Sequence, residues 1–272
     1  MARQYFGTDG IRGRVNQQPM TAETALRLAI AAARTFAPDG KGTVVIGRDT
    51  RNSGEMIEAA LVAGLTSMGL TPLLAGIVPT PAVAMTTRTT SACFGLMVSA
   101  SHNKYEDNGI KLFSPDGLKF DDPTEEALEA AMAAAFDDSF APPELIAKPQ
   151  RMVGVGDDYV RSCLATVSSG SKIKGMKVVL DCAHGAGFET APEALLHCGA
   201  DLTVIGAGPD GININAGRRH RVHSHVEHGP RPVSPVTRPD AGTHARRRPL
   251  CWRTYARPRF QFRWRAVRPH HS

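Results

Sequence analysis

Short apolar runs alternate with amphipathic stretches through the first half of the chain, and this alternation restricts the possible folds more than any other feature. The apolar runs have the length of strands, whereas the stretches between them repeat their apolar residues at helical spacing. Strands that alternate with helices predict a layered α/β fold in which helices cover a sheet. The expected strands are 43–47, 72–78, 93–98 and 109–113, and the expected helices are 20–36, 53–68 and 82–88.

Polar residues stand where several of these elements would begin or turn. Thr21, Ser53 and Asp122 precede or open helical stretches, and we expect each of them to cap its helix. The sequence S-P-D-G at 114–117 is typical of a tight turn. We therefore expect the strand before this turn to fold back on residues 118–120 as a hairpin.

The loop after the apolar run 93–98 carries reactive side chains. Ser101 offers a hydroxyl, His102 and Lys111 offer proton transfer and positive charge, and Asn103 offers neutral hydrogen bonds. No G-x-S-x-G motif surrounds the serine, which disfavours an acyl hydrolase. Phosphoryl transfer suits these residues better, because positioning and charge neutralisation dominate that chemistry. From these residues alone, a phosphoryl-transfer loop and a polar loop that satisfies its own turns are equal alternatives.

Two other stretches place arginine beside glycine. Arg12 lies in F-G-T-D-G-I-R-G, where glycines permit close approach to a ligand and an arginine can bind phosphate through two hydrogen bonds. Without further information, a strand with a surface arginine is the simpler interpretation. Arg48 and Asp49 lie in G-R-D-T-R, and an ion pair between them that supports the structure is as consistent with the sequence as a functional role.

Residues 99–103 read S-A-S-H-N and residues 107–111 read D-N-G-I-K, and together they resemble the phosphoserine loop of the α-D-phosphohexomutases. Both arginine-bearing stretches are similar to motifs of the same family. The family usually has proline after S-H-N, where this chain has Lys104. The sequence D-N-G-I-K-L-F most resembles that of the members that act on glucosamine phosphates. Members that act on mannose or glucose phosphates stay alternatives.

The resemblance implies an isomerase that interconverts glucosamine 6-phosphate and glucosamine 1-phosphate through a bisphosphate intermediate. Ser101 would carry the phosphoryl group, and His102 and Lys111 would move protons or stabilise charge. Arg12 would lie beside the serine and complete the catalytic set. The implied substrate- and phosphate-binding residues are Arg12, Arg48, Asn103 and Lys111.

The family also implies Mg²⁺, held by three aspartates of a D-G-D-x-D-R loop and by an oxygen of the phosphoserine. No such loop occurs in this sequence, so Ser101, through its phosphate, is the only metal ligand that the resemblance transfers. Mg²⁺ requires hard oxygen ligands of this kind. We therefore expect this chain alone to have little or no mutase activity.

The resemblance also divides the chain. The expected parts are a first domain with a layered mixed sheet at 1–150, an incomplete second α/β domain at 151–217 and an irregular tail at 218–272. Within the second domain we expect strands at 177–181 and 201–205. In the second part, Gly185 and Gly187 hint at a dinucleotide loop, but Thr190 stands where that motif needs glycine. Asp181, Cys182 and His184 could suggest a metal, although one each of three ligand types in a tight turn is more often structural.

Residues 218–272 differ in composition from the rest. They hold 14 arginines and no lysine, with only Glu227 and Asp240 as acids, in a chain whose net charge is +6. The resemblance ends after Asn215 or Gly217, and arginine without lysine is typical of GC-rich DNA translated in the wrong frame. We favour a change of frame near residue 216. The alternative is a tail that binds nucleic acid, with arginines on the phosphates and aromatic rings on the bases.

Cysteine usage and hydropathy bear on location. Five cysteines without C-x-x-C spacing favour reduced thiols and a cytoplasmic protein. There is no run of about eighteen apolar residues and no charged-then-apolar leader, so we expect neither a membrane span nor a secretory signal. By resemblance the partner is a small sugar phosphate. The sequence does not indicate whether the chain forms a homo-oligomer.

Overall fold

The computed structural model describes residues 5–7, 10–133, 140–167 and 173–216, and all of them belong to one compact unit. The predicted tail at 218–272 lies outside the described residues, so both interpretations of it stay predictions. None of the described helices is long and apolar enough to cross a membrane.

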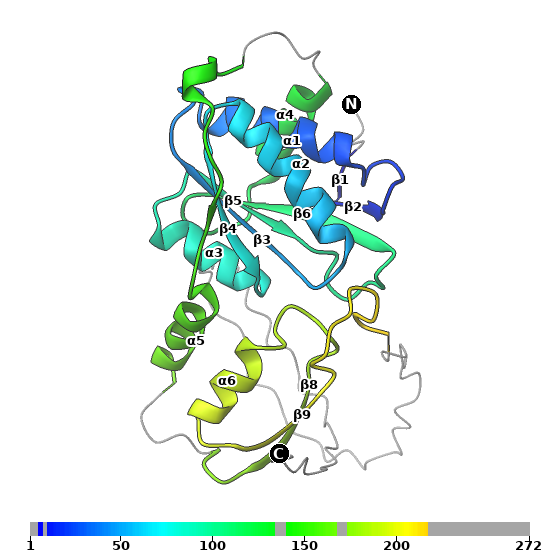
Figure 1. Cartoon of the computed structure of the whole chain (residues 1–272), viewed down its shortest axis with the longest axis vertical. Helices are drawn as coiled ribbons and strands as arrows, with labels where there is room; N and C mark the ends of the chain where they lie inside the picture. Colours follow the sequence, from blue (N-terminus) through cyan, green and yellow to red (C-terminus); the bar gives the residue numbers. More distant parts are fainter. Residues whose placement is uncertain (1–4, 8–9, 134–139, 168–172, 217–272) are drawn as a thin grey trace, which may run out of the picture. The chain divides into compact units, whose positions relative to one another are not determined.

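A seven-stranded mixed sheet forms the centre of the fold (Figure 1). Its strand order is β1-β2-β6-β5-β3-β4-β7. Strands β5, β3, β4 and β7 run parallel to one another, while β6 is antiparallel to both β5 and β2. The bounds are β1 Phe6–Gly7, β2 Gly10–Arg14, β3 Thr43–Arg48, β4 Thr71–Ile77, β5 Phe94–Val98, β6 Asp107–Phe113 and β7 Gln150–Arg151.

Helices cover both faces of this sheet, as the alternation of the sequence predicted. Side chains alternate between the faces along β3: Val44 and Ile46 enter the core beneath α1, α2 and α4, whereas Val45 enters the core beneath α3 and α5. The layered α/β fold is therefore confirmed. The helices are α1 Ala22–Phe36, α2 Ser53–Ser67, α3 Thr80–Thr89, α4 Asp122–Ala133 and α5 Val155–Ala165, with a short 3-10 turn η1 at Pro143–Leu145.

The three predicted helix caps have different outcomes. Thr21 caps α1, because its Oγ1 accepts a hydrogen bond of 3.1 Å from the Thr24 backbone N–H. The prediction for Ser53 is wrong: α2 follows Asn52, which makes no side-chain cap bond, and Ser53 Oγ contacts Asn108 Nδ2 at 2.8 Å. The prediction for Asp122 is displaced by one residue, since Asp121 accepts from the Thr124 backbone N–H at 3.0 Å.

The predicted hairpin at 109–120 forms only its turn. The Ser114 N–H donates to the Leu118 carbonyl at 2.8 Å, but the pairing stops at one bridge between Phe113 and Lys119. Strand β6 pairs instead with β5 and β2. A place between two longer strands satisfies both edges of β6, which a three-residue partner could not do.

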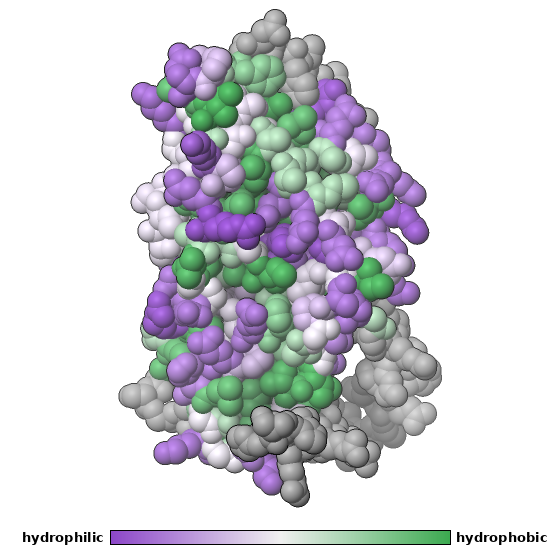
Figure 2. Space-filling view, viewed as in Figure 1, coloured by the Kyte–Doolittle hydropathy of each residue, from purple (hydrophilic) through white to green (hydrophobic). Residues whose placement is uncertain are grey.

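A second, smaller sheet follows α5. It consists of β8 (Lys177–Asp181) and β9 (Asp201–Ile205), which are parallel and connected through α6 (Thr190–His197). Both strands have the bounds that the sequence predicts. Several large apolar side chains of this part are exposed, namely Met176, Leu196, Val204 and Ile205. Figure 2 shows apolar surface where α6 and β9 lie.

Candidate active site

The loop that carries Ser101 leaves the end of β5 and is tightly turned. Ser101 has a left-handed backbone with φ of 56°, which is uncommon for a residue other than glycine. Two bonds inside the loop hold this turn: the Ser101 N–H donates to Ser99 Oγ at 3.0 Å, and the Asn103 N–H donates to the Ala100 carbonyl at 3.2 Å. The side chains of Ser101 and His102 are exposed.

A buried arginine holds the loop through hydrogen bonds to its backbone. Arg51 is fully buried, forms an ion pair with the buried Asp49, and donates to the carbonyl oxygens of Asn103 at 2.6 Å and Ser101 at 3.4 Å. Burial lowers the pKa of the Arg51 guanidinium below its usual value, and the Asp49 carboxylate opposes that effect. A buried cation that is paired and hydrogen-bonded in this way fixes the backbone on both sides of His102.

Asn215 reaches the same two carbonyl oxygens from the other end of the described chain. Its Nδ2 donates to the Ser101 carbonyl at 3.1 Å and to the Asn103 carbonyl at 3.0 Å. The segment that carries Asn215 and the turn after β8 are both attached to residues next to Asp49. The Asn52 N–H donates to the Gly211 carbonyl at 3.1 Å, and Thr50 Oγ1 donates to the His184 carbonyl at 2.5 Å.

Arg12 and Lys111 lie on strands next to the loop. Arg12 is opposite Gly109 in the β2–β6 pairing, and the Ser99 N–H donates to the Gly109 carbonyl at 2.9 Å. The charge of Arg12 contributes to the lowered pKa of Arg51, so the two guanidinium groups are within electrostatic range. Lys111 is opposite Met97 in β5, a residue that lines the cavity described below.

Gly109 has no room for a side chain. A Cβ there would meet the Ile11 carbonyl oxygen at 2.8 Å, the Ser99 carbonyl oxygen at 2.9 Å and Arg12 Cγ at 3.0 Å. We expect Gly109→Ala to lower the free energy of unfolding by about 1 to 3 kcal/mol through overpacking, as measured by urea denaturation. Gly208→Ala is the control, since a Cβ at Gly208 meets nothing within 4 Å. Equal effects of the two changes would contradict this account.

Asn103 and Arg48 have other partners in the structure. Asn103 Nδ2 donates to Asp107 Oδ2 at 2.9 Å, across the loop. Arg48 forms ion pairs with Glu55 at 2.9 Å and Glu58 at 3.6 Å, while Asp49 pairs with Arg51. Of the two alternatives for Arg48 and Asp49, the ion pair between them is therefore not the one that the described residues form. Burial raises the pKa of the Glu58 carboxyl, and the Arg48 charge opposes this effect. Arg48 lines a separate cavity, and its predicted role with phosphate stays a prediction.

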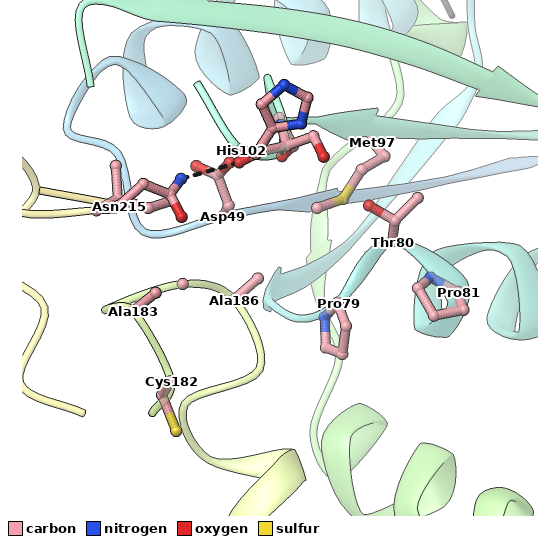
Figure 3. Close-up of a pocket in the computed structure, with 14 residues that line it drawn as sticks. Asp49, Pro79, Thr80, Pro81, Met97, His102, Cys182, Ala183, Ala186 and Asn215 are labelled. Atoms are coloured by element: carbon pink, nitrogen blue, oxygen red, sulfur yellow. Dashed lines mark hydrogen bonds between the residues drawn. The ribbon is translucent and has the colours of Figure 1, made fainter. Parts of the chain in front are cut away.

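Ser101 and His102 open onto a cavity of about 340 Å³. Figure 3 shows His102 on one wall, Pro79 and Thr80 on a second, and Ala183 and Ala186 opposite His102. Both polar and apolar groups line the cavity, including Asp49, Met97, Ser99, Cys182, Ile214 and Asn215. The arrangement places the exposed Ser101, next to the imidazole of His102, at a space large enough for a small polar ligand.

Among the described residues, no group of three or more His, Cys, Asp or Glu side chains is placed to hold a metal ion. The turn after β8 has a structural function instead, because Asp181 Oδ1 accepts a hydrogen bond of 2.8 Å from the Ala183 backbone N–H. The described residues therefore do not by themselves fit the Mg²⁺ site that the resemblance implies.

A family model described as "Phosphoglucomutase/phosphomannomutase, alpha/beta/alpha domain I" matches residues 3–138, which include β1 to β6 and the Ser101 loop. The chain belongs to the phosphoglucomutase/phosphomannomutase family. The family recognition made from the loop sequence is thus confirmed.

Members of this phosphohexomutase family resemble the chain over most of its length. A phosphoglucosamine mutase of Hyphomonas neptunium is 70% identical over 217 residues, which cover 80% of this chain and 48% of the relative. One of Cereibacter sphaeroides is 51% identical over 217 residues, with 79% and 48% covered. The chain spans about half the length of the curated relatives it matches.

A solved structure also resembles this phosphohexomutase chain. The crystal structure of a putative phosphomannomutase from Thermus thermophilus has a TM-score of 0.65 and 29% sequence identity. The match covers 78% of this chain and 48% of that chain. The fold and the family therefore agree in two independent comparisons.

Sequence reasoning did not identify two residues that hold the Ser101 loop in this candidate site, Arg51 and Asn215. Arg51 stands in G-R-D-T-R, where two arginines flank the aspartate and the sequence cannot tell which of them is buried. Asn215 ends I-N-I-N, where alternating apolar and amide residues indicate that the amides share a face, but not what they contact. Only the fold brings both to the Ser101 loop.

Cys182 lines the cavity and provides a pH-dependent probe of it. Burial, with a smaller effect of the Asp181 charge, raises the pKa of the Cys182 thiol. Because only the thiolate reacts, alkylation by iodoacetamide should reach half its maximal rate at a higher pH than for N-acetylcysteine. Asp181→Asn should move this midpoint down only partly, since burial is the larger cause. A midpoint that does not exceed that of N-acetylcysteine would contradict the prediction.

Proposed function

We propose that the chain contains the phosphoryl-transfer site of a phosphoglucosamine mutase, with Ser101 as the phosphoryl carrier. The reaction would interconvert glucosamine 6-phosphate and glucosamine 1-phosphate in the cytoplasm. The observation that carries the proposal is the exposed Ser101, held in a left-handed turn by its backbone and opening onto a cavity. The 70% identity to a phosphoglucosamine mutase supports the choice of sugar.

The proposed reaction has two phosphoryl transfers. Phosphorylated Ser101 gives its phosphoryl group to a free hydroxyl of the sugar monophosphate: a P–O bond forms to the sugar oxygen, and the bond between Ser101 Oγ and phosphorus breaks. The hydroxyl proton passes to a base, for which His102 is the candidate. The bisphosphate then reorients: Ser101 Oγ forms a bond to its other phosphorus, the bond from that phosphorus to the sugar oxygen breaks, and this oxygen takes up the proton from the base.

Other residues of the chain would bind and orient the phosphoryl group. Arg12 and Lys111 supply positive charge from β2 and β6, beside the loop that carries the serine, and Asn103 holds the loop through Asp107. Phosphoryl transfer depends mainly on such charge neutralisation and positioning. When bound in members of the family, Mg²⁺ would neutralise further phosphate charge, and the phosphate on Ser101 is the ligand that this chain would provide.

The test is phosphorylation of the purified chain. After incubation with glucosamine 1,6-bisphosphate and Mg²⁺ in solution, we expect intact mass spectrometry to find one added phosphoryl group and peptide mapping to place it on Ser101. Steady turnover of glucosamine 6-phosphate should be absent or very slow, because the sequence lacks the D-G-D-x-D-R loop. Addition at another residue would contradict Ser101 as the phosphoryl carrier. Rapid turnover that needs Ser101 would contradict the expected lack of mutase activity.

A phosphomannomutase or phosphoglucomutase is the second candidate. It is favoured by the likeness to the putative phosphomannomutase from Thermus thermophilus. Glucose and mannose 1,6-bisphosphates, used in parallel with the glucosamine compound, discriminate between the sugars. Faster labelling of Ser101 by either of them would replace the proposed substrate.

We further propose that the chain consists of a first domain at 1–150, a partial second domain at 151–217 and an out-of-frame tail at 218–272. The alignments with relatives extend over 217 residues, which supports this division. Sequencing of the coding DNA across codons 205–230 tests it, because a one- or two-base slip should restore a D-G-D-x-D-R loop. A confirmed frame with no such loop would favour a nucleic-acid-binding tail, for which salt-dependent DNA binding should disappear when 218–272 are deleted.

A further inference from the structure

Two carbonyl oxygens of the Ser101 loop each accept hydrogen bonds from two side chains. The carbonyls of Ser101 and Asn103 receive one set of donors from Arg51 Nη2 and another from Asn215 Nδ2. The loop's own sequence does not provide these donors, since Arg51 precedes it and Asn215 belongs to the segment after β9. The backbone on both sides of His102 is thus held from outside the loop.

The position of Asn215 is itself well defined. The residue is 8% exposed and has a left-handed backbone with φ of 58°, a conformation that asparagine tolerates better than most residues. Its backbone N–H donates to the Ala183 carbonyl at 2.9 Å, and the adjacent Ile214 is buried. The carboxamide is therefore already in place when it meets the loop, and little side-chain freedom is lost in forming the two bonds.

The charges around the loop explain why an amide suits this position. Arg12 and Arg51 already lie within electrostatic range, and the charge of Arg12 disfavours the protonated form of Arg51. A third cation would add to this repulsion, and a carboxylate would face two carbonyl oxygens without a proton to donate. A neutral amide supplies N–H donors without adding a charge.

We propose that Asn215 is a positioning residue for Ser101, acting through the loop backbone. This inference rests on the proposed function, because the purpose of the positioned hydroxyl is phosphoryl transfer. With Arg51 it holds the carbonyls on either side of His102, and so fixes the direction of the Ser101 Oγ–phosphorus bond relative to the cavity. A small misplacement of a reacting group is enough to slow a transfer of this kind.

The experiment compares the full chain with Asn215→Asp and Asn215→Gly. Asn215→Asp keeps the size of the side chain but removes both donors, and Asn215→Gly removes the side chain while permitting the positive φ. Amide hydrogen exchange of Ser101 and Asn103 should become about tenfold faster in both variants, the factor that corresponds to about 1.4 kcal/mol. Exchange in β8 and β9 should stay unchanged.

A matched control lies two residues away. Asn213 Nδ2 donates to the Gly208 carbonyl at 2.9 Å within its own turn, and no bond to the Ser101 loop is formed by this side chain in the described structure. Asn213→Asp introduces the same chemical change in the same segment. It should leave exchange in the Ser101 loop as in the unaltered chain.

A kinetic measurement separates positioning from a general structural role. In single-turnover labelling by the sugar bisphosphate, Asn215→Asp should lower the maximal rate of Ser101 phosphorylation and leave the half-saturating concentration within about twofold. Faster exchange throughout β8 and β9, unchanged exchange at the loop, or an effect confined to half-saturation would each overturn the inference. If the unaltered chain takes up no phosphoryl group, the proposed function fails, while exchange still decides whether Asn215 holds the loop.

Discussion

Replacing Ser101 by alanine is expected to abolish the uptake of a phosphoryl group from a hexose bisphosphate. The hydroxyl of Ser101 is the acceptor in the proposed transfer, and no neighbouring group can replace its oxygen without a different backbone position. The measurement is intact mass spectrometry over a time course, with the unaltered chain labelled under the same conditions. The loop should stay folded, because none of the hydrogen bonds that hold Ser101 uses its side chain: they involve its N–H and its carbonyl.

Ser99 provides the matched control for this experiment. It lies two residues before Ser101, lines the same cavity, and is 5% exposed. Ser99→Ala removes the acceptor of the Ser101 N–H but keeps the Ser101 hydroxyl. We expect labelling at Ser101 to persist at a reduced rate. Labelling that survives in Ser101→Ala, or that disappears only in Ser99→Ala, would move the carrier to the other serine.

Much of the fold could be predicted from local patterns. The strands β8 and β9 have their predicted bounds, and β3 and β5 differ by one residue at an end. Buried strands of a parallel sheet are short apolar runs, and the glycines and prolines between them mark the turns. The Thr21 cap was also predictable, since its bond to Thr24 depends on residues that are close in sequence.

The errors arise where distant residues compete with local signals. Ser53 has the residue type of a cap, but its hydroxyl contacts Asn108 of β6. The turn at 114–117 is a hairpin signal, yet β6 gains more hydrogen bonds between β5 and β2 than it could from three residues. In both cases tertiary contacts decide between two locally acceptable structures.

The candidate site likewise has one part that local sequence predicts and another that depends on tertiary contacts. The position of Ser101 and His102 just after β5 was predictable, because they follow an apolar run that forms a strand. The support of the loop was not, since it depends on which arginine of G-R-D-T-R is buried. The chain places Arg51 in the interior with Asp49 and directs Arg48 to Glu55 at the surface. No periodicity of the short segment 49–52 between β3 and α2 encodes that choice.

Arg51 should accordingly have a large effect on stability. Arg51→Met leaves the Asp49 carboxylate buried without its cation, and Asp49 is only 2% exposed. Breaking a buried ion pair in this way costs about 3 to 5 kcal/mol of the free energy of unfolding. Urea denaturation of the purified full chain, followed by circular dichroism, measures the change.

Two further variants test the cause. Arg161→Met removes the arginine of the exposed pair with Asp158, and we expect a loss of only about 0 to 1 kcal/mol. The double variant Asp49→Asn/Arg51→Met should recover part of the lost free energy of unfolding, because the unpaired carboxylate becomes a neutral amide. Asn215 still donates to both loop carbonyls in this variant. If the double variant is as unstable as Arg51→Met, the loss comes from the loop contacts of Arg51 and the unpaired Asp49 charge contributes little.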